Sequence, residues 1–188
     1  EDIAIMRAIP NMTVIVPVDA EETRKAIRAS LKHKGPIYIR ISRSPLPVLT
    51  DPQTVFQIGK MTSLAEGSDV TVFASGVMVY KALQAREILL KRGIYIRVIN
   101  VSTIKPLDQE EILRYTENIK GIVTAEEHSI IGGLGSAIAE ALSDKTIPIK
   151  MVGIKDQFGQ SANTHEELLE YYNLTPEAIV EKVETLLN

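Results

Sequence analysis

The chain contains no cysteine, so it can form neither disulfide bonds nor thiolate metal sites. It has only three histidines, and they are scattered, so they match neither a metal site nor a catalytic triad. Lysine and arginine form no cluster and the net charge is −3, which argues against binding to nucleic acid or to an anionic membrane surface. No apolar run approaches the length of a membrane span and no signal peptide precedes the patterned region, so we expect a cytoplasmic protein.

What the chain does contain is typical of a globular protein. Its 188 residues are 45% hydrophobic, which is enough to bury a sizeable core. This length fits one domain, or one domain with a piece of another. The chain begins at Glu1, without methionine and already inside a patterned segment, so we expect it to be a section of a longer protein.

The most informative stretch is Gly121–Leu142. The β-branched apolar run at 122–125 predicts a buried parallel strand. Gly132, Gly133 and Gly135 then allow a sharp turn, after which apolar residues recur at helical spacing. A strand, a glycine turn and a helix in this order are the repeating unit of a doubly wound, mostly parallel α/β sheet, which is the fold that we predict.

The glycine turn has two interpretations. It can simply allow close packing of helix and strand, or it can be part of a dinucleotide fingerprint. For the fingerprint, Gly133 and Gly135 supply the first two glycines, and Asp156 lies about 20 residues further on. However, Ile138 stands where the third glycine belongs, and the carboxylates of Glu126–Glu127 would repel a diphosphate. We favour the structural interpretation and keep a free-standing nucleotide-binding or regulatory module as an alternative.

The remaining patterns predict two parts joined by a linker. Residues 1–44 show helix, strand, helix and strand, which is too little to close a sheet and predicts the second half of another α/β domain. Residues 45–61, which begin with a proline-rich stretch, predict a linker. Residues 62–188 hold the other elements and predict a separate domain, in which segments 58–64 and 70–74 would form a hairpin.

Several helix starts are marked by residues that can cap free amide groups. Asp19–Glu22 and Thr164–Glu167 both fit the capping box, and Thr175 is followed by a proline suited to a first helical turn. Residues 102–108 predict a polar loop whose last residue, Asp108, caps a short helix.

Four motifs resemble the thiamine-diphosphate-dependent transketolase group. Glu126–Ser136, which reads EEHSIIGGLGS, is similar to the C-terminal domain of that group, and residues 1–19 are similar to the second half of its pyrimidine-binding domain. Residues 42–47 (SRSPLP) and Phe158–Ala162 (FGQSA) are similar to transketolase itself. The resemblance covers essentially the whole chain and identifies it as the C-terminal section of a transketolase.

The resemblance implies a catalyst that is incomplete in this chain. The whole enzyme would transfer a two-carbon ketol unit between sugar phosphates, with thiamine diphosphate and Mg²⁺ as cofactors. The group's cofactor-activating glutamate and its diphosphate- and metal-binding domain lie upstream of the position that matches Glu1. The chain is therefore expected to be inactive alone, to bind neither cofactor nor metal, and to need an N-terminal transketolase section or subunit as partner. A homodimer through the C-terminal domain is also implied.

Arg43 is the candidate substrate-binding residue, with Ser42 beside it. It follows a predicted strand at its carboxyl end, where α/β folds bind ligands, and its guanidinium is a fixed fork of donors that matches phosphate oxygens. By the resemblance, the matching arginine holds the terminal phosphate of the sugar. Without the resemblance, a solvated arginine or a salt bridge is the plainer interpretation. No residue of the chain is expected to be catalytic, or to bind the cofactor or a metal.

The histidines have structural interpretations. His33 is expected to be exposed at a helix end, and His165 to face solvent in a first helical turn. For His128 we favour a hydrogen bond within its own loop over an interface contact. A beta-type subunit of a 2-oxo-acid dehydrogenase remains an alternative to the transketolase.

Overall fold

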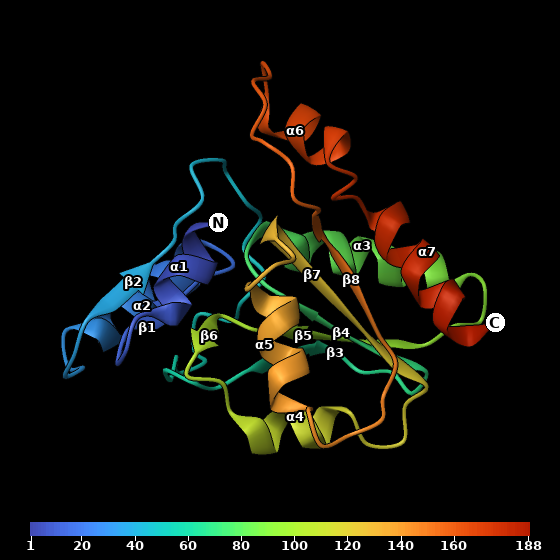
Figure 1. Ribbon diagram of the computed structural model, residues 1–188, viewed down its shortest axis with the longest axis horizontal. Coiled ribbons are helices and arrows are strands. Elements are labelled where there is room, and N and C mark those ends of the chain that lie inside the picture. The colour runs from blue at the N-terminus through green and yellow to red at the C-terminus, as the bar shows by residue number, and fades with distance from the viewer.

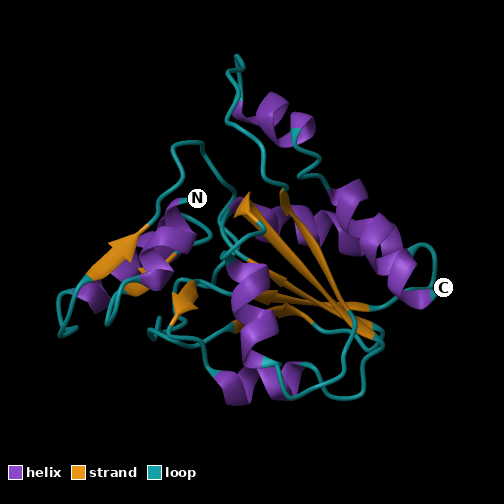
Figure 2. Ribbon diagram, viewed as in Figure 1, coloured by secondary structure: helices purple, strands orange, loops and turns teal.

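The computed structural model describes residues 1–188 and contains two β-sheets with helices packed around them (Figure 1, Figure 2). The strands are β1 (Thr13–Ile15), β2 (Ile37–Ile39), β3 (Thr62–Ala65), β4 (Val70–Ala74), β5 (Ile96–Asn100), β6 (Thr103–Lys105), β7 (Gly121–Ser129) and β8 (Ile149–Ile154). The helices are α1 (Asp2–Ala8), α2 (Ala20–Ser30), α3 (Val77–Leu90), α4 (Gln109–Tyr115), α5 (Leu134–Ala141), α6 (His165–Tyr171) and α7 (Pro176–Leu187). None of these helices combines the length and the apolar character that crossing a membrane requires.

The larger sheet has the strand order β3-β5-β4-β7-β8. Strands β5, β4, β7 and β8 are parallel to one another, and β3 is an antiparallel edge strand. The central strand β4 is buried along its whole length, as expected for an apolar strand that has helices on both of its faces. The predicted doubly wound, mostly parallel α/β fold is confirmed.

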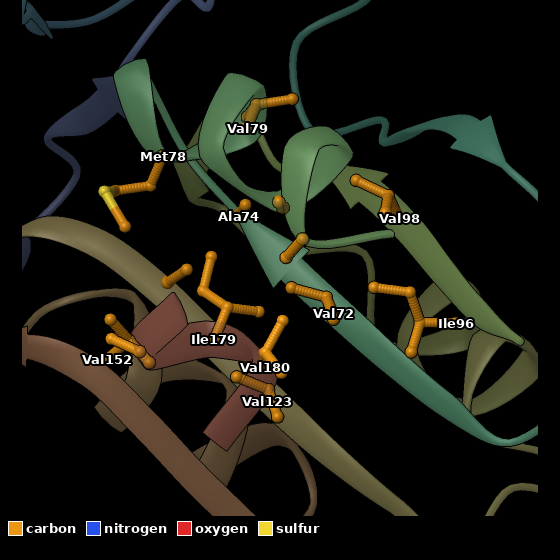
Figure 3. Close-up of a cluster of buried hydrophobic side chains, with 14 of the residues drawn as sticks. Val72, Ala74, Met78, Val79, Ile96, Val98, Val123, Val152, Ile179 and Val180 are labelled. Atoms are coloured by element: carbon orange, nitrogen blue, oxygen red, sulfur yellow. The ribbon is translucent and has the colours of Figure 1, made fainter. Parts of the chain in front are cut away.

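Alternate residues of the strands face two separate layers of helices. Val72 and Ala74 belong to a core cluster with α3 and α7, in which Ile179 of α7 is fully buried (Figure 3). Phe73, between them in sequence, belongs to the cluster on the other face, together with Ile138 of α5. This alternation follows from the two-residue period of a strand, and it places helices on both faces of the sheet.

The predicted hairpin between segments 58–64 and 70–74 is wrong. Strand β3 pairs with β5, with Thr62 opposite Asn100, and does not contact β4 as a neighbour in the sheet. The connection crosses β5 closely, because a Cβ atom on Gly67 would overlap the backbone of Ile96. Strand β4 has parallel partners on both sides, so the sheet leaves only its outer edge for β3.

The smaller sheet contains strands from both sides of the predicted linker. Strand β1 pairs with β2 in parallel, and β6 adds to its other side in antiparallel orientation. Residues 102–108 are therefore not entirely a loop, because Thr103–Lys105 forms this third strand. The buried Ile3, Val14 and Val16 belong to the same core cluster as α4 and α5. The first part of the chain thus packs directly on the larger sheet.

The predicted helix caps are confirmed. Asp19 accepts a hydrogen bond from the amide of Glu22 (2.7 Å), while the Glu22 carboxylate accepts one from the amide of Val18 (2.7 Å). Thr164 and Thr175 cap α6 and α7 through their hydroxyl groups in the same way. These contacts join residues that are close in sequence, which is why the sequence pattern identified them.

Candidate functional site

The carboxyl edge of the larger sheet is covered by the segment from β1 to α2. The amide of Val16 donates to the carbonyl of Ser102 (2.7 Å). The Glu22 carboxylate accepts hydrogen bonds from Asn100, the last residue of β5 (2.9 Å), and from the hydroxyl of Ser102, two residues further on (2.5 Å). Burial raises the pKa of Glu22 above its ordinary value, although these hydrogen bonds oppose the increase. The segment from β1 to α2 thus covers the carboxyl end of β5, on the side of the sheet where doubly wound folds usually bind ligands.

The glycine turn holds a carboxylate of the same chain. Glu126, fully buried, accepts hydrogen bonds from the amides of Leu134 (2.6 Å) and Gly135 (2.8 Å) at the start of α5. A Cβ atom on Gly133 would overlap the Glu126 carboxylate, so this position requires glycine. The amides that would bind a diphosphate already have a partner. The structural interpretation of the glycines is supported, and a nucleotide-binding module is not favoured.

The outer side of the same turn contacts α1. Arg7 donates to the carbonyls of Gly132 (2.5 Å) and Gly133 (3.2 Å), and it forms an ion pair with Glu140 of α5 (2.7 Å). Gly132 has a φ of 76°, and a Cβ atom there would lie 2.8 Å from the side chain of Ala4. The turn is therefore a contact surface for α1. The sequence analysis did not identify Arg7 or Glu126 as a residue that contacts the glycine turn, because neither stands at a motif spacing from its partner.

Ser42 and Arg43 lie just beyond β2. The Arg43 side chain is exposed and forms no hydrogen bond or ion pair. Ser42 is half-buried, and its hydroxyl accepts a hydrogen bond from the amide of Ser44 (3.2 Å), which shapes a short turn around Arg43. The structure thus brings the two predicted residues together at a strand end and leaves the guanidinium of Arg43 available for a ligand.

Arg40, three residues earlier, is already engaged. It forms ion pairs with Asp2 of α1 (3.3 Å) and with Glu127 of β7 (3.3 Å). Burial on its own would raise the pKa of Asp2, but the hydrogen bond from the Tyr38 hydroxyl (2.7 Å) and the charge of Arg40 lower it below its ordinary value. Arg40 therefore connects the first part of the chain to the larger sheet, while Arg43 does not.

The histidines differ from expectation at two of three positions. His128 is buried, and its Nδ1 lies 2.7 Å from the carbonyl of Ser129, so a local hydrogen bond is present. However, both residues lie in β7 and not in a loop, and the Nε2 of His128 also accepts from the amide of Ala4 in α1 (3.4 Å). His165 is not simply solvent-facing, because its Nε2 lies 2.6 Å from the carboxylate of Glu127. His33 is half-buried rather than exposed, and its ring contacts the hydroxyl of Thr13 (3.2 Å). Both corrections involve partners far away in sequence.

The residues of this chain do not fit a site for thiamine diphosphate and its metal. No group of three or more histidine, aspartate or glutamate side chains is arranged so that it could hold a metal ion. The amides at the glycine turn, which could otherwise bind phosphate groups, are bonded to Glu126. The geometry instead defines an α/β protein with two sheets, in which the end of β5 is covered and the exposed Arg43 follows β2 of the smaller sheet.

Comparison with known families gives two matches that together span nearly the whole chain. Residues 59–179 match the family model "Transketolase, C-terminal domain", and residues 1–48 match "Transketolase, pyrimidine binding domain". The first of these matches covers more than half of the chain. The chain therefore belongs to the transketolase family.

Individual relatives agree with this assignment. The chain is 43% identical over 187 residues to a transketolase C-terminal section of Methanocaldococcus jannaschii, covering 97% of this chain and 58% of the relative. It is 45% identical over 181 residues to the 6-deoxy-6-sulfo-D-fructose transketolase subunit SqwH of Clostridium sp. (strain MSTE9), covering 96% of this chain and 56% of the relative. The chain thus spans just over half the length of these relatives.

A solved structure matches the entire chain. It is described as "Split gene transketolase, inactive beta4 tetramer", and it superposes with a TM-score of 0.93 at 44% sequence identity. The match covers 100% of this chain and 61% of the other.

Proposed function

We propose that this chain is the C-terminal section or subunit of a split transketolase. Together with an N-terminal section, it would transfer a two-carbon ketol unit between sugar phosphates. The observation that carries the proposal is the match of the whole of this chain to 61% of a split-gene transketolase chain at 44% identity. We also propose the division into a partial pyrimidine-binding domain (1–44), a linker (45–61) and a C-terminal domain (62–188).

This chain alone would bind neither thiamine diphosphate nor Mg²⁺. Thiamine diphosphate, when bound in the complete enzyme, supplies the electron sink that stabilises the carbanion of the transferred ketol unit. The lack of an acidic cluster and the occupied amides of the glycine turn support placing its diphosphate and Mg²⁺ outside this chain. This chain alone would then be inactive. Turnover by the pure chain with thiamine diphosphate and Mg²⁺ would contradict this assignment.

Within this enzyme, Arg43 would bind the terminal phosphate of the sugar, with Ser42 shaping the turn that presents it. Three features support this role: the position just after a strand, the exposed guanidinium, and the engagement of the neighbouring Arg40 by Asp2 and Glu127. A planar guanidinium can bind two phosphate oxygens at once. A contact so far from the reacting carbon helps to position that carbon.

We further propose that copies of this chain associate with one another through the C-terminal domain. The description of the matching structure as a tetramer of beta chains supports self-association of such chains. A dimer through this domain would bring two copies of the C-terminal section into one enzyme.

The role of Arg43 is tested in the enzyme reconstituted with its N-terminal section. Arg43→Ala removes a charge-assisted contact worth about 1.5–3 kcal/mol, so kcat/KM for phosphorylated sugars should fall roughly tenfold to a hundredfold, mainly through KM. Arg43→Lys should recover only part of this loss, because an ammonium lacks the planar fork. Arg28→Ala is the matched control, since Arg28 is also exposed and unpaired, and it should change little.

The donor substrate provides the decisive comparison. Hydroxypyruvate carries no phosphate, so its kinetics should be nearly the same in the Arg43→Ala enzyme. Equal losses for phosphorylated and non-phosphorylated donors would mean that Arg43 acts only on structure, and the assignment would fail.

A further inference from the structure

A segment on the C-terminal side of the larger sheet extends away from the body of the protein. Residues 155–164, here called the arm, connect β8 to α6, and every one of them is exposed. Figure 1 shows the arm and α6 rising above the sheet, away from the other helices. The phenyl ring of Phe158 in the arm is 94% exposed, more than any other large hydrophobic side chain of the protein.

The outer part of the arm has the composition of a contact surface. Lys155 and Asp156 at the start of the arm are charged, but residues 157–163 carry no charged side chain, although 24% of the whole chain is charged. Tyr171, at the end of α6, adds a second exposed aromatic ring (64%) that stacks edge-on against Tyr172. Depletion of charge and enrichment of aromatic side chains are the features that distinguish the centres of protein–protein interfaces from other surface. The Phe158 ring is almost entirely uncovered by the rest of the chain.

The arm is fixed in shape at both ends. The hydroxyl of Tyr172 donates to the carbonyl of Phe158 (2.7 Å), which holds the first half of the arm against α6. At the other end, the amide of Asn163 donates to Glu167 (3.0 Å), and His165 contacts Glu127 of β7 (2.6 Å). An arm held in this way loses less conformational entropy when a partner packs on it.

A cavity of about 670 Å³ lies beside the arm, and the ends of β7 and β8, α6, the start of α1 and Arg40 also line it. Six of its 16 lining residues are hydrophobic, among them Leu168, Leu174 and Phe158, while Asp2, Arg40 and Glu127 place charges in the same cavity. A projecting aromatic ring and a cavity with apolar side chains in part of its lining therefore occupy the same patch of surface. A two-fold contact between identical chains requires such a self-complementary patch, because each copy must offer both the group and the space that receives it.

We propose that the arm, Tyr171 and the adjacent cavity form an interface with a second copy of this chain. The inference rests on the proposed self-association and names the surface that produces it. In this arrangement Phe158 of each copy packs against the apolar side chains in the cavity of the other. Burying one phenyl ring per chain at the centre of the contact makes Phe158 its dominant residue.

The first test measures self-association of the whole chain by sedimentation equilibrium. Phe158→Ser should raise the dissociation constant at least about tenfold, as truncation of a central aromatic anchor does. Val55→Ser is the matched control, since Val55 is 85% exposed in the linker, and its dissociation constant should stay within about twofold of the unsubstituted chain. Equal effects of the two substitutions would overturn the proposal.

The second test uses the absence of native cysteine, which makes any introduced thiol unique. No atom lies within 4 Å of a Cβ built on Gly159, so Gly159→Cys should fold normally. Its reaction with a maleimide should slow as the protein concentration rises through the dissociation constant, whereas the reaction of Val55→Cys should not change.

The outcomes separate the two proposals. An unsubstituted chain that stays monomeric at all concentrations refutes self-association, and the arm interface with it. An assembly in which the Gly159→Cys thiol stays fully reactive leaves self-association intact and refutes the arm interface alone. Protection of that thiol only after the N-terminal section is added would assign the arm to a different partner and would also refute the inference.

Discussion

Substitution of Gly133 by alanine should destabilise the protein far more than an ordinary change from glycine to alanine. A Cβ atom at Gly133 would overlap the carboxylate of Glu126, which is fully buried and bonded to the amides of Leu134 and Gly135. The carboxylate must therefore leave its position at the start of α5. Two buried amides then lose their acceptor, and a buried carboxylate loses its donors.

These losses determine the size of the effect. Each buried group left without its partner costs about 1–3 kcal/mol, and a buried charge separated from its partners costs about 3–5 kcal/mol, so we expect a loss of about 3–5 kcal/mol in the free energy of unfolding. In a chain of this length, that corresponds to a decrease of roughly 6–20 °C in Tm. Urea unfolding followed by circular dichroism measures the free energy, and a scan of the same samples measures Tm.

Gly159→Ala is the matched control. It makes the same chemical change at a position where a Cβ atom has no neighbour within 4 Å, so it should alter stability by less than about 0.5 kcal/mol. The double substitution Glu126→Gln with Gly133→Ala should cost less than the sum of the single changes, because both disrupt the same contacts. A loss below about 1 kcal/mol for Gly133→Ala would show that the turn can relax, and the reasoning would be refuted.

Two further substitutions test the contacts that connect the parts of the chain. Arg7→Lys should lower the free energy of unfolding by about 1–2 kcal/mol, because an ammonium cannot bind Gly132 and Glu140 together as the guanidinium does; an unchanged urea midpoint would contradict this. The pKa of Asp19 lies below its ordinary 3.8, since hydrogen bonds from the amides of Glu22, Leu49 and Thr50 outweigh its burial, which by itself raises the pKa. The stability that the Asp19 carboxylate contributes is therefore present above about pH 4 and is lost as the pH falls through the lowered pKa. Asp19→Asn should cost about 1–3 kcal/mol at pH 7 and much less near pH 2 in urea titrations; a pH-independent difference would contradict the argument.

The sequence by itself determined the features that depend on neighbouring residues. The caps at Asp19, Thr164 and Thr175 join a side chain to an amide a few positions away, and the apolar strands between helical patterns predicted the doubly wound sheet. It also placed Ser42 and Arg43 directly after a strand. That Arg43 contacts a sugar phosphate stays a prediction.

Only the tertiary structure decided which distant groups meet. No local pattern indicated that β3 would pair with β5, or that Thr103–Lys105 would complete the smaller sheet. It also did not reveal that Arg40 is engaged by Asp2 and Glu127 while Arg43 remains free. Strand order and ion pairs between distant segments depend on which edges and charges remain available after the core has packed. A pattern of neighbouring residues does not show which strand edges and which charges will pair with each other.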